Sequence, residues 1–106
     1  MGASKTQLFS EKQNELALYS KALGHPARVA ILEYLYKLNA CMCGDLVEET
    51  QLAQSTISQH LQQLKKAGLI KGTIEGKQLC YCIDPKAFEY MKSVMQRFLD
   101  SLKTEE

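Results

Sequence analysis

The segment 54–83 constrains the fold of this 106-residue chain more than any other part of it. Its first part carries apolar side chains at the i, i+4, i+7 spacing of one helix face. These are Ile57, Leu61 and Leu64. Gly68 then stands at a helix C-cap position, so a helix is expected over 54–67. Two strand-like runs follow, 69–74 and 78–83, joined by a turn that contains glycine, and this pattern predicts a β-hairpin.

Helical patterns surround this segment on both sides. Apolar periodicity predicts helices over 8–23 and 27–38, the second directly preceded by a proline that suits a first helical turn, and a short helix over 44–50. A last helix is expected over 85–103, because Asp84 can serve as its N-cap and a proline follows. Short helix, tight turn, second helix and hairpin are the winged helix-turn-helix order.

We therefore predict a mainly α fold with a small β-hairpin wing (α+β), a winged helix-turn-helix. A chain of 106 residues holds one modest core, so 1–106 is expected to be a single domain. Within it, 44–68 is the predicted helix-turn-helix and 69–83 the wing.

Nothing in the sequence suggests a membrane span or a secretion signal. No apolar run approaches the length of a membrane helix, and the first residues lack an apolar stretch, so we expect a cytoplasmic protein with no membrane partner. The formal net charge is only +1, but lysines outnumber acidic residues between 54 and 78, which hints at a surface that faces phosphates.

The polar face of the helix 54–67 has an unusual composition for a solvated surface. Its N-terminal end carries Ser, Thr and Gln, whereas exposed helix faces usually prefer Glu and Lys. Uncharged hydrogen-bonding side chains suit the reading of base edges. We interpret this face as a DNA-reading surface, with an ordinary solvated surface as the alternative.

Three stretches carry a more specific pattern. They are ALGHPARVAILEYL at 22–35, GDLVEETQLAQSTISQHLQQLKKAGLI at 44–70, and a hairpin ending in YCID. The most specific part reads S-x-x-S-x-H-L and then K-x-A-G-L. Together these stretches resemble the ArsR/SmtB family of bacterial winged-helix repressors, over about 16–98. The resemblance implies a homodimer that binds operator DNA and releases it when an inducer or an oxidant binds.

The resemblance places the start of the helix 54–67 in the major groove, where Gln pairs well with adenine and Ser or Thr with several base edges. The wing tip is placed for phosphate or minor-groove contact. The expected DNA-contacting residues are Gln54, Ser55, Thr56, Ser58, Gln59, His60, Gln63, Lys65, Lys66, Lys77 and Gln78. His60 has an alternative role in helix packing. Ala53 stands where the family often has a capping serine, which leaves the start of this helix open.

The four cysteines form two C-x-C pairs, Cys41 with Cys43 and Cys80 with Cys82. The family's thiol site begins three residues before an aspartate, where this chain has Met42, so that site is not carried over. If 39–43 forms a strand beside 79–83, all four thiols can converge on one small sheet. The last helix has no histidine, which argues against the family's other zinc site.

Three roles for the cysteines remain open. They could be inert core residues, because cysteine behaves as a small hydrophobe. They could instead use their thiolates to bind a soft metal or a metalloid such as arsenite, which is the one candidate cofactor. They could also form a redox switch.

The last helix carries a heptad-like apolar seam, and the rest of so short a chain offers few residues to cover it. With the first helix it predicts a dimer interface, and the alternative is an intramolecular seam between these two helices. The expected interface residues are Phe9, Leu16, Phe88, Met91, Met95, Phe98 and Leu102.

Other classes of function are also considered. A thiol redox or metal-carrier protein built on the C-x-C pairs is the main alternative, but no His or Lys is placed by sequence to activate a thiolate, so we expect no enzyme. A winged-helix repressor without cysteine-based sensing is the other alternative.

Overall fold

The computed structural model describes residues 8–38, 41–43, 51–75 and 78–102. Within the strands, some side chains are outside this description too. These are the side chains of Cys43, Ile74, Glu75, Gln78 and Leu79. The predicted helix 44–50, which is the first half of the expected helix-turn-helix, lies outside the described residues.

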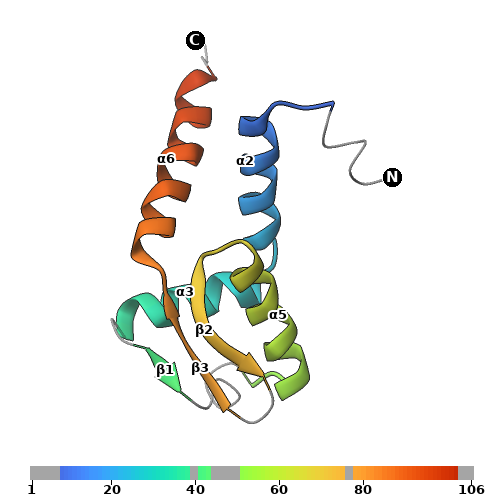
Figure 1. The fold of residues 1–106 in the computed structure, drawn as a ribbon, viewed down its shortest axis with the longest axis vertical. Coiled ribbons are helices and arrows are strands. Elements are labelled where there is room, and N and C mark those ends of the chain that lie inside the picture. The colour runs from blue at the N-terminus through green and yellow to red at the C-terminus, as the bar shows by residue number, and fades with distance from the viewer. Residues whose placement is uncertain (1–7, 39–40, 44–50, 76–77, 103–106) are drawn as a thin grey trace.

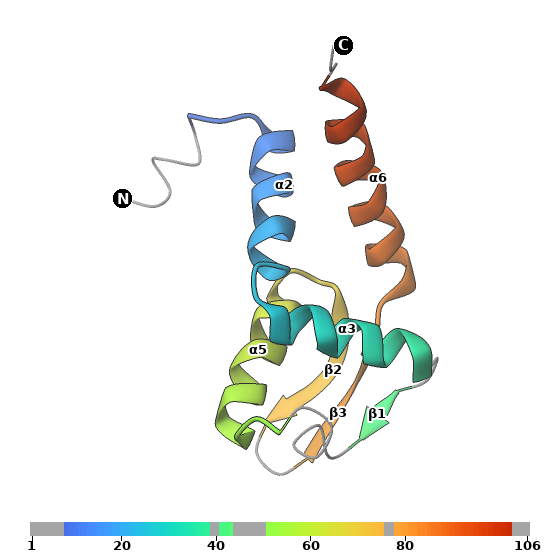
Figure 2. The same ribbon diagram turned by 180° about the vertical axis from the view of Figure 1, so that it is seen from behind.

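The described residues form helices around a small antiparallel sheet, whose strand order is β1-β3-β2 (Figure 1). The elements are α2 (Glu11–Ala22), α3 (Pro26–Leu38), β1 (Met42–Cys43), α5 (Gln54–Lys66), β2 (Ile70–Glu75), β3 (Gln78–Ile83) and α6 (Pro85–Ser101). In both views α2 and α6 project side by side from one end of the body, and α3 crosses one face of the sheet (Figure 2). The predicted winged-helix class, mainly α with a β-hairpin, is confirmed.

The first described helix begins later than the apolar pattern predicted. Helix α2 starts at Glu11 and not at residue 8, because Ser10 caps it. The Ser10 hydroxyl accepts from the Gln13 backbone N–H at 3.1 Å, and the Gln13 side chain accepts from the Ser10 N–H at 2.9 Å. This reciprocal capping box fixes the helix start. The predicted start at residue 8 was therefore wrong.

Helix α5 begins at Gln54 as predicted, although Ala53 offers no side-chain cap. It ends at Lys66, one residue before the predicted end, with Gly68 in the left-handed conformation just beyond. Helix α6 begins as predicted, because the Asp84 carboxylate accepts from the Ala87 N–H at 3.3 Å and proline occupies the first turn.

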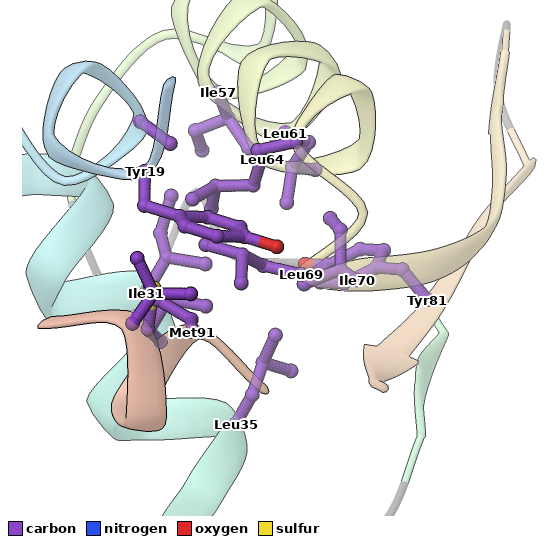
Figure 3. Close-up of a cluster of buried hydrophobic side chains, with 14 residues drawn as sticks. Tyr19, Ile31, Leu35, Ile57, Leu61, Leu64, Leu69, Ile70, Tyr81 and Met91 are labelled. Carbon is purple, nitrogen blue, oxygen red and sulfur yellow. The ribbon is translucent and has the colours of Figure 1, made fainter. Parts of the chain in front are cut away.

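A single core lies where α5, α3 and the sheet meet, with contributions from both projecting helices (Figure 3). The apolar stripe predicted on α5 is confirmed, since Ile57, Leu61 and Leu64 are each 0% exposed. Tyr81 on β3 fills the centre of the sheet side. This core fixes α5 with its opposite face directed outward. No helix in the described part of the chain is long and apolar enough to span a bilayer.

Candidate functional site

The outward face of α5 carries the residues that the sequence predicted to read DNA. Gln54, Ser55, Gln59 and Gln63 are exposed. Thr56 and Ser58 are half-buried. The first turn of α5 has no acidic residue, and its last turn holds two lysines. The helix thus presents uncharged hydrogen-bonding groups at its N-terminal end and positive charge at its C-terminal end, which is a chemistry compatible with base edges and phosphates.

The two lysines at the end of α5 are placed differently from each other. The Lys65 ammonium donates to the Gly72 carbonyl at 2.7 Å, so it ties α5 to strand β2 of the wing. Lys66 is exposed. This role of Lys65 was missed from sequence, because it depends on where the wing folds back. Lys77 lies outside the described residues, as does the side chain of Gln78, and their predicted contacts stay predictions.

His60 is buried, in contrast to the exposed glutamines of the same helix. It is 9% exposed, and its ring packs against that of His25 with centroids 4.3 Å apart. His25 in turn accepts from the Ala27 N–H at 3.0 Å at the start of α3. This contact favours the packing alternative for His60, which joins α5 to the segment directly before α3.

The buried position of His60 makes stability depend on pH. Burial, then His25, then Arg28, hold the pKa of His60 below its ordinary value of 6.5. The folded state therefore favours the neutral ring. The contribution of His60 to stability is present above its ordinary pKa and is lost as the pH falls through its lower pKa in the folded protein. We expect the midpoint of thermal unfolding to drop between about pH 7 and about pH 5, and to drop less in His60→Gln. An equal drop in both proteins would contradict this account.

The cysteines are organised by the pairing of β1 with β3. Met42 lies opposite Tyr81 and Cys43 opposite Cys80, so the prediction of a small strand beside the second hairpin strand is confirmed. Continuing this register by one residue sets Cys41 opposite Cys82. The Cys41 and Cys82 thiols are hydrogen-bonded to each other.

The four cysteines do not behave as one set. Cys41 and Cys82 carry free thiols, whereas Cys80 is disulfide-bonded. Cys41 and Cys80 are exposed, so the inert-core alternative does not hold for these two. Among the described residues, no three His, Cys, Asp or Glu side chains come together in a way that could hold a metal ion. A site made of all four cysteines stays a prediction, because the side chain of Cys43 is outside the description.

The free thiol pair opens onto a groove of about 450 Å³ between the sheet, the end of α3 and the start of α6. Besides Cys41 and Cys82, the groove is lined by Leu35, Tyr36, Lys71, Ile83, Pro85, Phe88 and Glu89. The hydrogen bond with Cys41 raises the pKa of the Cys82 thiol, and burial adds to this, while Lys71, its neighbour on β2, acts in the opposite direction. Sequence reasoning missed this groove, because three separate segments build it.

The predicted interface residues on α2 and α6 divide into two groups. Met91 is buried within the chain, and Leu16, Phe88 and Met95 pack against the core. By contrast, others remain exposed on the projecting helices or directly beside their ends. These are Phe9, Phe98 and Leu102, together with Leu18 and Leu99, which the sequence reasoning did not select. The seam therefore serves both the intramolecular α2–α6 contact and an uncovered apolar surface.

Comparison with known proteins assigns the chain to a family. Residues 25–71 match the model described as bacterial regulatory protein, arsR family. An uncharacterised HTH-type transcriptional regulator of Methanocaldococcus jannaschii is 38% identical over 86 residues, which span 79% of this chain and 96% of that relative. The chain belongs to the ArsR family. Its family resemblance, inferred above from sequence motifs, is thereby confirmed.

Other proteins are similar over shorter or more divergent alignments. The HTH-type transcriptional regulator CmtR of Mycobacterium tuberculosis is 35% identical over 72 residues, covering 68% of this chain and 60% of CmtR. A crystal structure of an ArsR family transcriptional regulator superposes with a TM-score of 0.63 at 21% identity, over 91% of this chain and 97% of that one. HlyU of Vibrio cholerae superposes with a TM-score of 0.61 at 22% identity, over 86% and 99%. These two structures share the fold.

Members of the ArsR family are DNA-binding transcriptional regulators and not enzymes. This ArsR-family chain is accordingly a transcriptional regulator. The alternative of a thiol enzyme is set aside.

Proposed function

We propose that this ArsR-family protein is a cytoplasmic, homodimeric repressor that reads operator DNA with α5 and releases it when a thiol-reactive inducer binds. The observation that carries the proposal is the outward face of α5. Its exposed Gln and Ser side chains stand clear of the core, with no acidic residue in the first turn and two lysines in the last. Such a face can hydrogen-bond to bases and is not repelled by phosphates.

The homodimer is supported by the projecting helices. Phe98 on α6 and Leu102 just after it are 44% and 54% exposed, and Phe9 before α2 is 56% exposed. Because α2 and α6 are already joined, with the Tyr90 hydroxyl donating to Glu15 at 2.6 Å, they offer one ordered surface to a second copy. A two-fold pair would set two α5 helices on half-sites about 34–36 Å apart.

Inducer control is supported by the position of the free thiols. Cys82 lies on β3, which runs from the wing into the N-cap of α6. The Asp84 N–H also donates to the Leu69 carbonyl at 2.9 Å, so the end of β3 is tied to the start of the wing. A group bound to the thiols would therefore act on β3, the wing strand that leads directly into the proposed dimerisation helix α6. Soft metals, metalloids such as arsenite, and oxidants all react with thiols.

The reading role of α5 is tested by replacing one exposed side chain. DNA sites are first selected from a random pool by the wild-type protein, and affinities are then measured by fluorescence anisotropy. We expect Gln59→Ala to lower the preference for the selected site over scrambled DNA by about 1–3 kcal/mol, the value of a lost base contact.

Gln62→Ala, which removes an exposed glutamine from the same helix outside the predicted contact set, is the matched control and is expected to keep the preference. If Gln59→Ala weakened the selected and the scrambled DNA equally, Gln59 would position the protein and not read the sequence. If the wild type enriched no sequence at all, the proposal of a sequence-specific repressor would fail.

A further inference from the structure

The chain has only two histidines, and they meet in the fold although they lie far apart in the sequence. His60 lies on α5 and is 9% exposed, whereas His25 lies directly before α3 and is open to solvent. Their ring centroids are 4.3 Å apart, and the ring planes form an angle of 52°. Histidine is the one residue type whose ordinary pKa falls between pH 5 and pH 8, and this single contact contains every histidine of the chain.

The contact between the rings accepts two neutral imidazoles and disfavours protonated ones. The His25 Nδ1 atom accepts from the Ala27 backbone N–H at 3.0 Å, so the neutral ring carries its proton on Nε2. A proton added to His25 must enter at Nδ1, where it takes the lone pair that accepts this bond at the start of α3. A proton added to His60 places a charge on a buried side chain. Two protonated rings at this distance would also repel each other.

The surroundings of His60 supply no negative charge to balance a proton. Among the described residues, the groups whose charge acts on His60 are His25 and Arg28, and neither is acidic. Arg28 lies in the first turn of α3, and its Nη1 donates to the Lys21 carbonyl at 3.1 Å, which holds the guanidinium at the end of α2. Within the same described part of the chain, α5 itself and strand β2, which packs against it, add no charge that acts on His60. Protonation therefore favours separation of the two rings.

The histidine contact lies where a small movement reaches the DNA-reading face of α5. His60 directly follows Gln59, and in Figure 2 the start of α3 lies beside α5. The beginning of α5 has no side-chain cap, since its N-cap residue is Ala53, so the position of this end depends on packing. The other end is tied to the wing by the bond of 2.7 Å from the Lys65 ammonium to the Gly72 carbonyl. Separation of the rings would therefore shift α5 against α3 while the helix stays attached to the wing.

We propose that the contact between His25 and His60 is a pH switch, and that acidification releases operator DNA by shifting α5 against α3. The inference rests on the proposed function and adds to it a second means of control that does not use the thiols. Hydrogen bonds to base edges weaken steeply when donor and acceptor are displaced, so the complex requires α5 in its seated position. The complex then keeps both rings neutral, whereas the released protein can bind protons. Affinity therefore falls as the pH falls.

The first test measures the affinity of the full chain for the selected site by fluorescence anisotropy at fixed salt, at about pH 7.5 and about pH 5.5. We expect about a tenfold loss at the lower pH, the factor for one histidine with the ordinary pKa of 6.5 that must be neutral in the complex. Added positive charge by itself strengthens binding to any DNA, so scrambled DNA should bind equally or more tightly there. Undiminished affinity for the selected site, or an equal loss on both DNAs, would overturn the proposal.

The histidines are tested by variants that cannot be protonated at these positions. The double variant His25→Gln with His60→Gln should show less than about a twofold change between the two pH values, whatever its affinity at the higher one. Gln62→His, which adds an exposed histidine to the same helix, is the matched control and should show the full loss of the wild type. A tenfold loss that persisted in the double variant would assign the pH dependence to other groups and overturn the proposal.

Release is distinguished from unfolding in the protein without DNA. Circular dichroism should show the same helix content at both pH values, and a loss of helix at the lower one would assign the effect to unfolding and overturn the switch. In NMR spectra, rings 4.3 Å apart should give a nuclear Overhauser effect at the higher pH, and this effect should disappear at the lower pH. Its persistence there would overturn the proposal. A wild type that selected no DNA would count against the proposed function alone, and the ring contact would still decide the switch.

Discussion

Replacing Gly72 with alanine is expected to lower the free energy of unfolding by about 4 kcal/mol, at the upper end of single substitutions. Gly72 has a φ of 130°, a conformation that side chains rarely adopt. An added Cβ would lie 2.0 Å from the Cys80 carbonyl oxygen and 2.7 Å from the Tyr81 Cα. Both atoms belong to the β3 backbone, so the hairpin must separate to make room. Tyr81 is 1% exposed, and its displacement would open the core.

Gly68→Ala provides the matched control for this effect. Gly68 also has a positive φ, 81°, but a Cβ there would meet no heavy atom within 4 Å. Only the left-handed backbone cost of about 1–2 kcal/mol should be seen. Urea unfolding followed by circular dichroism gives both values. Equal losses in the two variants would show that backbone conformation, and not contact with β3, decides the role of Gly72.

The second large effect concerns the projecting helices. We expect Phe98→Glu to raise the dimer dissociation constant by about a thousandfold or more, because each of the two symmetric copies would bury an unpaired carboxylate. Phe98 is 44% exposed in the single chain, so it is available to a partner. Operator affinity should fall with the dimer, since only a dimer places two α5 helices on two half-sites.

Ser93→Glu adds the same charge to an exposed position on α6 away from the apolar seam, and it should leave the dimer intact. Sedimentation equilibrium measures both dissociation constants, and circular dichroism checks that both variants are folded. If Phe98→Glu sedimented like the wild type while folded, the interface would lie elsewhere on the molecule.

The sequence was a good guide to the starts of two helices, where the signal was local. The apolar spacing on α5 and the Asp84 cap with its proline predicted the beginnings of α5 and α6 correctly. The capping box at Ser10 is also a local signal, S-x-x-Q, but the prediction of α2 rested on apolar spacing alone and did not use it. Even the pairing of β1 with β3 followed from fold class and alternation.

What could not be predicted depends on contacts between distant segments. The packing of His60 against His25 and the bond from Lys65 to Gly72 arise only once α5 meets α3 and the wing. The groove beside Cys82 is another case, since Tyr36 and Phe88 reach it from α3 and α6, which are far apart in the sequence. Residue spacing within one helix or strand does not reveal contacts between separate elements. For the same reason, the apolar seam on α6 could not be divided beforehand between core and surface.

The central claim is that two copies of α5 read one operator. A hydroxyl-radical footprint of the full chain on its selected DNA site tests this most directly. We expect two protected patches on one face of the duplex, with centres about 34–36 Å apart, and loss of both patches together in Phe98→Glu. A single patch, or uniform protection that is the same on scrambled DNA, would contradict it.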